Sequence, residues 1–171
     1  IEAGTFLMAG ATLGNITLKN VDPTHLKIVL RKLNQAGCEL IIEDDSITIK
    51  KCEKLHPVDM TTDVHPGFPT DLQAQWVALM AVANGSSHVT DMIYHDRFAH
   101  VPELIRLGAD ITLNKNMALV RGPKKLKGAR VMSTDIRASA SLLIAALLAE
   151  GESEISRIYH IDRGYEKIEE K

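Results

Sequence analysis

The sequence has only two cysteines in 171 residues and no apolar run long enough to span a membrane. Cys38 and Cys52 are too few for a disulfide scaffold, and their spacing is not that of a metal site. We therefore expect a cytosolic protein in which Cys38 is packed and Cys52 is an ordinary exposed thiol. A membrane helix needs about 18 consecutive apolar residues, so no membrane partner is predicted.

The sequence also lacks an excess of charge of either sign. Lys and Arg number 20 and Asp and Glu number 22, which gives a formal net charge of −2. A surface that binds nucleic acid usually carries a clear positive excess. The composition therefore argues against a nucleic-acid partner, although it leaves room for a local basic pocket.

One order of elements recurs along the chain: an Ala-rich helix that ends at a glycine, a strand, and a second helix. Gly14 and Gly85 are separated by 85 − 14 = 71 residues, and Gly37 and Gly108 by 108 − 37 = 71 residues. Such a constant offset indicates internal repeats. We place the units at about residues 1–66, 67–134 and 135–171, with the third incomplete. Because the chain starts within a predicted helix and stops within the third unit, we expect it to be cut at both ends.

The patterns of apolar residues predict a single α/β domain over residues 1–171. Some helices are apolar on nearly every side and so should be buried on several faces; they lie near 4–13, 71–83 and 136–149. Others have one apolar face, near 24–36 and 98–107, and hairpins are predicted over 38–49 and 110–120. A Rossmann sheet fits less well, because no Gly-rich phosphate loop follows a strand. We predict pseudo-symmetric repeats with buried helices.

A candidate site lies at the start of the second buried helix. Pro66, Gly67 and Pro69 favour an extended approach that delivers Thr70 and Asp71 to the helix start. Either residue could simply be the N-cap of the helix. Alternatively, Asp71 is a carboxylate at the mouth of a cleft, able to accept the proton of a substrate hydroxyl. The two interpretations are compatible, because the start of a helix can face a ligand.

Several arginines occupy matching places in the repeats. Asp135 and Arg137 open the third buried helix, where Asp135 could be a cap and the two could form a weak surface ion pair. Arg97 and Arg163 each follow an Asp after the strands of the second and third units. Guanidinium groups bind carboxylate and phosphate groups well, so the repetition suggests arginines that share an anion.

Taken together, these motifs resemble the UDP-N-acetylglucosamine 1-carboxyvinyltransferase family of enolpyruvyl transferases. The motifs that carry the resemblance are Pro66–Gln75, Asp96–Phe98, Thr134–Ser141 and His160–Glu166, and the similarity runs over residues 1–171. It implies an inside-out α/β barrel fold of βαβαββ units. Members have two such domains with the active site between them. This chain would be most of the C-terminal domain, and the absent N-terminal domain would be its partner.

The resemblance also implies an activity and a set of residues. The enolpyruvyl group of phosphoenolpyruvate would pass to the 3′-hydroxyl of UDP-N-acetylglucosamine, with no metal or other cofactor, as the first committed step of peptidoglycan synthesis in the cytoplasm. Asp71 would bind that hydroxyl and act as base, and the backbone at Ile93 would contact the nucleotide sugar. Around phosphoenolpyruvate the resemblance places Arg97, Arg137 and Arg163, with Asp135 beside them, and it counts Asp71, Asp135 and Arg163 as catalytic.

The resemblance also has limits. The family's reactive cysteine, which fosfomycin alkylates, lies in the N-terminal domain and matches neither Cys38 nor Cys52, so we expect this chain alone to be inactive. The family pattern before Arg97 differs from His95-Asp96, so no role is carried over to His95. Two alternatives remain. One is an enolpyruvylshikimate-phosphate synthase, which fits the motifs less well, and the other is a non-catalytic module that binds nucleotide sugars.

Overall fold

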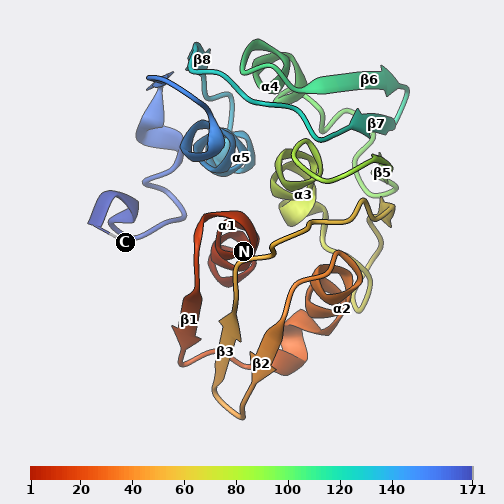
Figure 1. Cartoon of the computed structure of the whole chain (residues 1–171), viewed down its shortest axis with the longest axis vertical. Helices are drawn as coiled ribbons and strands as arrows, with labels where there is room; N and C mark the ends of the chain where they lie inside the picture. Colours follow the sequence, from red (N-terminus) through yellow and green to blue (C-terminus); the bar gives the residue numbers. More distant parts are fainter. Residues whose placement is uncertain (171) are drawn as a thin grey trace.

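Helices rich in small residues pack against one another at the centre of the molecule (Figure 1). The computed structural model describes residues 1–170. The central helices are α1 (Glu2–Leu13), α3 (Gln73–Met80) and α5 (Ile136–Leu148). All eight residues of α3 are buried, and Gly4 of α1 lies so close to Leu72 that no methyl group would fit between them. The small side chains therefore let these helices approach closely, and the predicted burial of α3 on several faces is confirmed.

The first sheet lies beside α1 and is antiparallel. It contains β1 (Ile16–Lys19), β3 (Ser46–Ile49) and β2 (Leu40–Ile42), in that order. Helix α2 (Lys27–Gln35) packs here through Val29, Leu30 and Leu33 and follows the short helix η1 (Pro23–Leu26). The predicted one-sided helix and the hairpin over 38–49 are thus confirmed.

The second sheet has the order β4-β5-β7-β6. Strands β6 (Asp110–Asn114) and β7 (Met117–Arg121) form the predicted second hairpin, and β7 also pairs with β5 (Ser86–Thr90). Strand β4 (Met60–Thr61) runs parallel to β5. Helix α4 (Val101–Arg106) contacts β6. The order β4-α3-β5-α4-β6-β7 is the predicted βαβαββ pattern.

The third sheet is a pair of strands that flanks α5. Strand β8 (Arg130–Met132) runs parallel to β9 (Glu154–Ser156), and the short helices η3 (Ile158–His160) and η4 (Ile168–Glu170) follow. Strands β4 and β8 were not predicted, because two or three residues are too few to show an alternating pattern. Both precede the predicted unit starts near residues 67 and 135, and each pairs with the strand after a buried helix.

The expectation of two separate thiols was wrong. Cys38 and Cys52 form a disulfide, with their Cα atoms 5.0 Å apart. Cys38 precedes β2 and Cys52 follows β3. The two strands are paired, and Leu40 of β2 lies opposite Ile49 of β3. The hairpin therefore brings its two flanks together, which the count and spacing of cysteines did not reveal.

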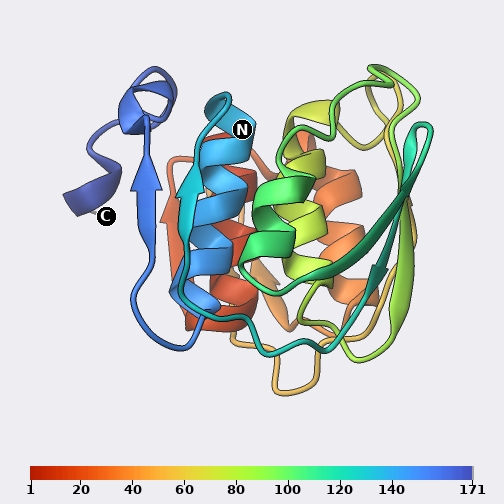
Figure 2. The ribbon, with the colours of Figure 1, turned by 90° about the horizontal axis from the view of Figure 1, so that it is seen from above.

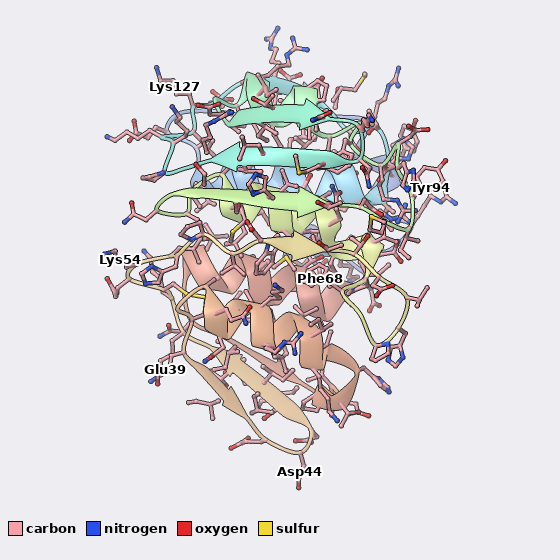
Figure 3. The ribbon with its side chains drawn as sticks, turned by 90° about the vertical axis from the view of Figure 1, so that its right-hand side faces the viewer. Glu39, Asp44, Lys54, Phe68, Tyr94 and Lys127 are labelled. Carbon is pink, nitrogen blue, oxygen red and sulfur yellow. A yellow bond between two sulfur atoms is a disulfide. The ribbon has the colours of Figure 1, made fainter. Side chains whose placement is uncertain are left out.

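The central helices begin at the same end of the molecule. Figure 2 shows α1, α3 and α5 side by side with similar axis directions, and the start of each lies at the upper end of that view. Strands β4 and β5 also end there: Figure 3 shows both arrows pointing toward the side that carries Tyr94, away from Lys54 and Lys127. This end gathers the helix starts and the loops that follow the parallel strands. No helix within residues 1–170 is both long and apolar enough to cross a membrane.

Candidate active site

The carboxylate of Asp71 meets two guanidinium groups at this end of the molecule. Oδ1 of Asp71 accepts hydrogen bonds from Nη1 of Arg97 at 3.1 Å and from Nε of Arg137 at 2.6 Å. The Asp71 side chain is 35% exposed, and those of Arg97 and Arg137 are 19% and 27% exposed. The three groups are therefore held together and still reachable from solvent.

Each of these side chains comes from a different segment. Asp71 lies in η2 (Thr70–Leu72), the turn of 3₁₀ helix before α3. Arg97 lies in the loop between β5 and α4, and Arg137 is in the first turn of α5. They meet because α3 and α5 begin at the end of the molecule where β5 stops (Figure 2). This grouping of Asp71, Arg97 and Arg137 was predicted from the sequence.

The prediction that Thr70 or Asp71 caps α3 was wrong. The N-cap of α3 is Leu72, and no side chain caps the helix there. The hydroxyl of Thr70 instead donates to Oδ2 of Asp91 at 2.6 Å and accepts from Nη1 of Arg97 at 3.0 Å. The extra turn η2 places Thr70 and Asp71 ahead of the first residues of α3. Their side chains are therefore used in contacts between elements.

The prediction that Asp135 caps α5 is confirmed. Its Oδ1 accepts the backbone N–H groups of Arg137 at 2.7 Å and Ala138 at 3.1 Å. The guanidinium of Arg137 points to Asp71, and no ion pair between the side chains of Asp135 and Arg137 is found within residues 1–170. The cap thus fixes the backbone of Arg137 while its side chain completes the site.

Asp91, which was not predicted as a site residue, lies directly after β5 and is completely buried. Its Oδ1 accepts the Thr62 hydroxyl at 2.8 Å and the backbone N–H groups of Ile93 and Tyr94 at 2.9 and 2.8 Å. Its Oδ2 accepts the Thr70 hydroxyl. The available sequence signal was an acidic residue at the end of an alternating strand, which is also a common turn residue.

The hydrogen bonds decide the charge of Asp91. Burial acts to raise the pKa of its carboxyl group, because it disfavours the charged form. The hydrogen bonds from Thr70, Tyr94, Thr62 and Ile93 favour the carboxylate and outweigh burial, so the pKa lies below its ordinary value. Asp91 is therefore an ionised carboxylate beneath the site.

The loop after β5 forms an exposed apolar rim beside the arginines. Met92, Ile93 and Tyr94 are all exposed, and the guanidinium of Arg97 lies 5.1 Å from the centre of the Tyr94 ring. This is a cation–π contact. Ile93, predicted to contact a nucleotide sugar, thus lies four residues from an arginine of the site, and its N–H already donates to Asp91.

Arg163 does not contact Asp71 within the hydrogen bonds and ion pairs of residues 1–170. It lies in an exposed turn after η3, and its side chain has no hydrogen bond or ion pair within residues 1–170. Its neighbour Gly164 packs against Ile136, the first residue of α5, so the turn lies next to the start of that helix. The grouping of Arg163 with the other arginines therefore stays a prediction.

Tyr165 connects this turn to the central helices through hydrogen bonds. Its hydroxyl forms a hydrogen bond of 2.8 Å with the hydroxyl of Thr5 in α1. Nε2 of Gln75 in α3 donates to the Tyr165 hydroxyl at 3.5 Å and to Thr5 at 3.1 Å. Burial raises the pKa of Tyr165, and the hydrogen bonds with Thr5 and Gln75 oppose this only in part. The segment that carries Arg163 is thus tied to two other units.

The arrangement is suited to a polar ligand with negative charge. The two guanidinium groups favour anions, while the carboxylate of Asp71 can accept a hydroxyl hydrogen. Within residues 1–170, the His, Cys, Asp and Glu side chains do not gather in groups of three or more that could hold a metal ion. The chemistry available from these side chains is charge stabilisation and proton transfer.

The family profile and the relatives that match this chain are all described as carboxyvinyltransferases. Residues 1–171 match the sequence profile of the family described as EPSP synthase (3-phosphoshikimate 1-carboxyvinyltransferase). Two relatives named UDP-N-acetylglucosamine 1-carboxyvinyltransferase match this whole chain. That from Pelodictyon phaeoclathratiforme is 58% identical to it and that from Campylobacter jejuni subsp. doylei 54%. The chain spans about 41% of the length of each of these relatives.

Solved structures support the predicted fold. The enolpyruvyl transferase NikO from Streptomyces tendae has a TM-score of 0.89 at 28% identity, over 99% of this chain and 41% of that one. The EPSP synthase from Acinetobacter baumannii has a TM-score of 0.67 at 17% identity, over 90% of this chain and 38% of that one, which shows the fold alone. The predicted α/β fold of enolpyruvyl-transferase type is confirmed.

Proposed function

Because this chain belongs to the EPSP synthase family, we propose that it forms part of a UDP-N-acetylglucosamine 1-carboxyvinyltransferase. The proposed reaction moves the enolpyruvyl group of phosphoenolpyruvate to the 3′-hydroxyl of UDP-N-acetylglucosamine and releases phosphate. The observation that carries the proposal is the carboxylate of Asp71 held between the guanidinium groups of Arg97 and Arg137.

The geometry at Asp71 suits the addition step. Its Oδ1 is occupied by the two arginines, whereas its Oδ2 has no hydrogen-bond partner within residues 1–170. Oδ2 is therefore free to accept the hydrogen of the 3′-hydroxyl. The hydroxyl oxygen bonds to C2 of phosphoenolpyruvate as Asp71 takes the hydroxyl proton, and C3 gains one proton in exchange. The hydroxyl thus adds across the C2–C3 double bond and gives a tetrahedral ketal.

Elimination completes the proposed reaction. The bond between C2 and the phosphate oxygen breaks, C3 loses a proton, and the double bond re-forms as phosphate leaves. Arg97 and Arg137 would oppose the negative charge of the phosphoenolpyruvate carboxylate and phosphate throughout. We assign Arg163 and Asp135 to the same anion site and the backbone at Ile93 to the nucleotide sugar.

The remaining parts of the proposal concern the rest of the protein. The relatives are more than twice as long as this chain, and we propose that their additional domain closes the site and brings the cysteine that fosfomycin alkylates. The protein would then act in the cytoplasm in cell-wall synthesis, and so in cell shape and division. The chain alone, without the other half of the anion site, would not turn over.

The family description also names a shikimate enzyme, so the acceptor needs its own argument. The curated relatives at 54–58% identity are named for UDP-N-acetylglucosamine, whereas the EPSP synthase structure is only 17% identical. We therefore favour the nucleotide sugar. Competition between shikimate-3-phosphate and UDP-N-acetylglucosamine tests this choice, and displacement of the sugar by shikimate-3-phosphate at equal concentration would contradict it.

Calorimetric titration with UDP-N-acetylglucosamine tests the proposal directly. Asp71→Ala is compared with Asp110→Ala, because Asp110 also pairs with two cations, Arg121 and Lys124, but lies on β6. Loss of a charged hydrogen-bond acceptor should weaken binding by about tenfold or more in Asp71→Ala. Asp110→Ala should bind like the wild type. Absent binding in the wild type, or equal binding in wild type and Asp71→Ala, would favour a module without this activity.

A further inference from the structure

Asp91 is buried beneath the site, and its two oxygens serve two different parts of it. Oδ2 accepts a hydrogen bond from the hydroxyl of Thr70, and this hydroxyl in turn accepts a hydrogen bond from Nη1 of Arg97. Oδ1 holds the turn at residues 92–94 through the N–H groups of Ile93 and Tyr94. We propose that Asp91 is a positioning residue that orients the Thr70 hydroxyl and thereby fixes Arg97 on Asp71. This inference rests on the proposed function for its effect on substrate.

The Thr70 hydroxyl donates its single hydrogen to Asp91. A hydroxyl has one hydrogen to donate and lone pairs to accept with. Because Thr70 gives its hydrogen to Oδ2 of Asp91 at 2.6 Å, only a lone pair is left to face Nη1 of Arg97, 3.0 Å away. A carboxylate accepts hydrogen bonds and cannot donate one, so Asp91 sets the direction of both hydrogen bonds.

The same carboxylate supports Arg97 from a second side. The Thr62 hydroxyl donates to Oδ1 of Asp91 at 2.8 Å and accepts the N–H of Met92 at 2.9 Å. With the N–H groups of Ile93 and Tyr94, this fixes the loop that places the Tyr94 ring against the Arg97 guanidinium. Arg97 is thus held by Thr70 and by Tyr94, and Asp91 holds both supports.

A chain of hydrogen bonds therefore leads from a buried charge to the reacting groups: Asp91, Thr70, Arg97 and Asp71. Burying a carboxylate is costly unless its oxygens are fully bonded. The turn at 92–94 uses only Oδ1, so it does not explain the short bond from Thr70 to Oδ2. That bond connects Asp91 to Arg97.

The inference is tested by a double-mutant cycle on the 171-residue chain, with UDP-N-acetylglucosamine as titrant. Thr70→Val removes the hydroxyl at nearly constant shape, Thr70→Ser keeps it, and Asp91→Asn removes the charge. We expect about tenfold weaker binding in Thr70→Val and in Asp91→Asn, recovery in Thr70→Ser, and no further loss in the double variant. A general loss of stability would instead make the two effects add. Additive effects, or wild-type affinity in Thr70→Val, would overturn the inference.

A matched control and a second readout separate this inference from the proposed function. Thr112→Val removes a threonine that accepts a hydrogen bond from Arg121, and it should leave binding unchanged. If the wild type does not bind the sugar, the proposed function fails, and the guanidinium NMR signal of Arg97 in the free chain decides the inference. That signal should move in Thr70→Val and stay in Thr70→Ser and Thr112→Val. No movement in Thr70→Val would overturn it, even if Asp91→Asn does not fold.

Discussion

Asp71 and Arg137 lie 66 residues apart in the sequence, yet Nε of Arg137 donates to Oδ1 of Asp71 at 2.6 Å. Nη1 of Arg97 donates to the same oxygen at 3.1 Å. Both arginines bind one oxygen of the carboxylate, and within residues 1–170 its other oxygen accepts no hydrogen bond from them. The site therefore combines a positively charged wall with a directed hydrogen-bond acceptor.

Replacement of Arg137 by lysine should separate binding from stability. Lysine keeps the charge but lacks the planar guanidinium that donates from Nε. We expect roughly tenfold weaker binding of UDP-N-acetylglucosamine by calorimetry, because Asp71 loses its orientation. The free energy of unfolding in urea should change by about 1 kcal/mol or less, since the pair is partly exposed.

Arg130→Lys is the control for that experiment. Nε of Arg130 pairs with Glu154 at 2.9 Å on the distant strands β8 and β9. Both its binding of the sugar and its stability should match the wild type. Wild-type affinity in Arg137→Lys would contradict the role assigned to the guanidinium.

The stability of the fold should decrease in mild acid because of His100. Burial lowers the pKa of His100 to about 4, although the nearby Asp135 acts to raise it. The unfolded chain takes up this proton at a pH of about 6.5, so the folded chain binds fewer protons between pH 6.5 and 4. His100 therefore makes the free energy of unfolding fall as the pH falls through that range, by up to about 1.4 kcal/mol per pH unit.

Urea unfolding at several pH values measures this slope. In His100→Gln the free energy of unfolding should depend less steeply on pH, by the contribution of one titrating group, because glutamine does not titrate. An unchanged slope in His100→Gln would show that other groups cause the acid sensitivity.

Removal of the Tyr165 hydroxyl should destabilise the chain by about 1 kcal/mol, because it removes a short hydrogen bond with Thr5 and a long one with Gln75. Thr5 loses the bond of 2.8 Å but keeps Gln75 as a partner. Urea unfolding of Tyr165→Phe measures the loss, and Tyr159→Phe, which alters an exposed ring, is the control. Equal stability of the two variants would contradict the buried contact.

A methyl group at Gly122 should be far more damaging than one at Gly14. The added Cβ of Gly122→Ala would press on the carbonyl oxygens of Met80, Ala81 and Ala83 at the end of α3. We expect a loss of about 1–3 kcal/mol, typical of overpacking, measured by urea unfolding. Gly14 has no atom within 4 Å of the added Cβ and an extended backbone, so Gly14→Ala should change stability by less than about 0.5 kcal/mol. Equal stability of the two variants would contradict this packing.

The helix starts show how far the sequence could be interpreted. Thr70 with Asp71 and Thr134 with Asp135 look alike in sequence, and both were interpreted as possible caps. Asp135 caps α5, whereas an additional 3₁₀ turn before α3 releases Thr70 and Asp71 for contacts with Arg97 and Asp91. A cap depends on the exact helix start, and sequence patterns locate that start only to within a few residues.

Other differences between prediction and structure arise from very short strands or from contacts between residues that are distant in sequence. Strands β4 and β8 are too short to show a pattern, and they are recognisable only by their pairing with β5 and β9. The bond between Cys38 and Cys52 follows from the pairing of β2 with β3. Asp91 resembled a turn residue until Thr62 and Thr70 were found to donate to it.

The sequence by itself determined the repeated order of elements, the buried small-residue helices and the type of residue at the site. Local composition and periodicity are enough for that, because they act within one helix or one repeat. Only the tertiary structure decided that Arg97 and Arg137 reach Asp71 while Arg163 does not, and that Asp91 lies beneath them. These contacts depend on where separate helices and strands end in space, which packing of the whole core determines.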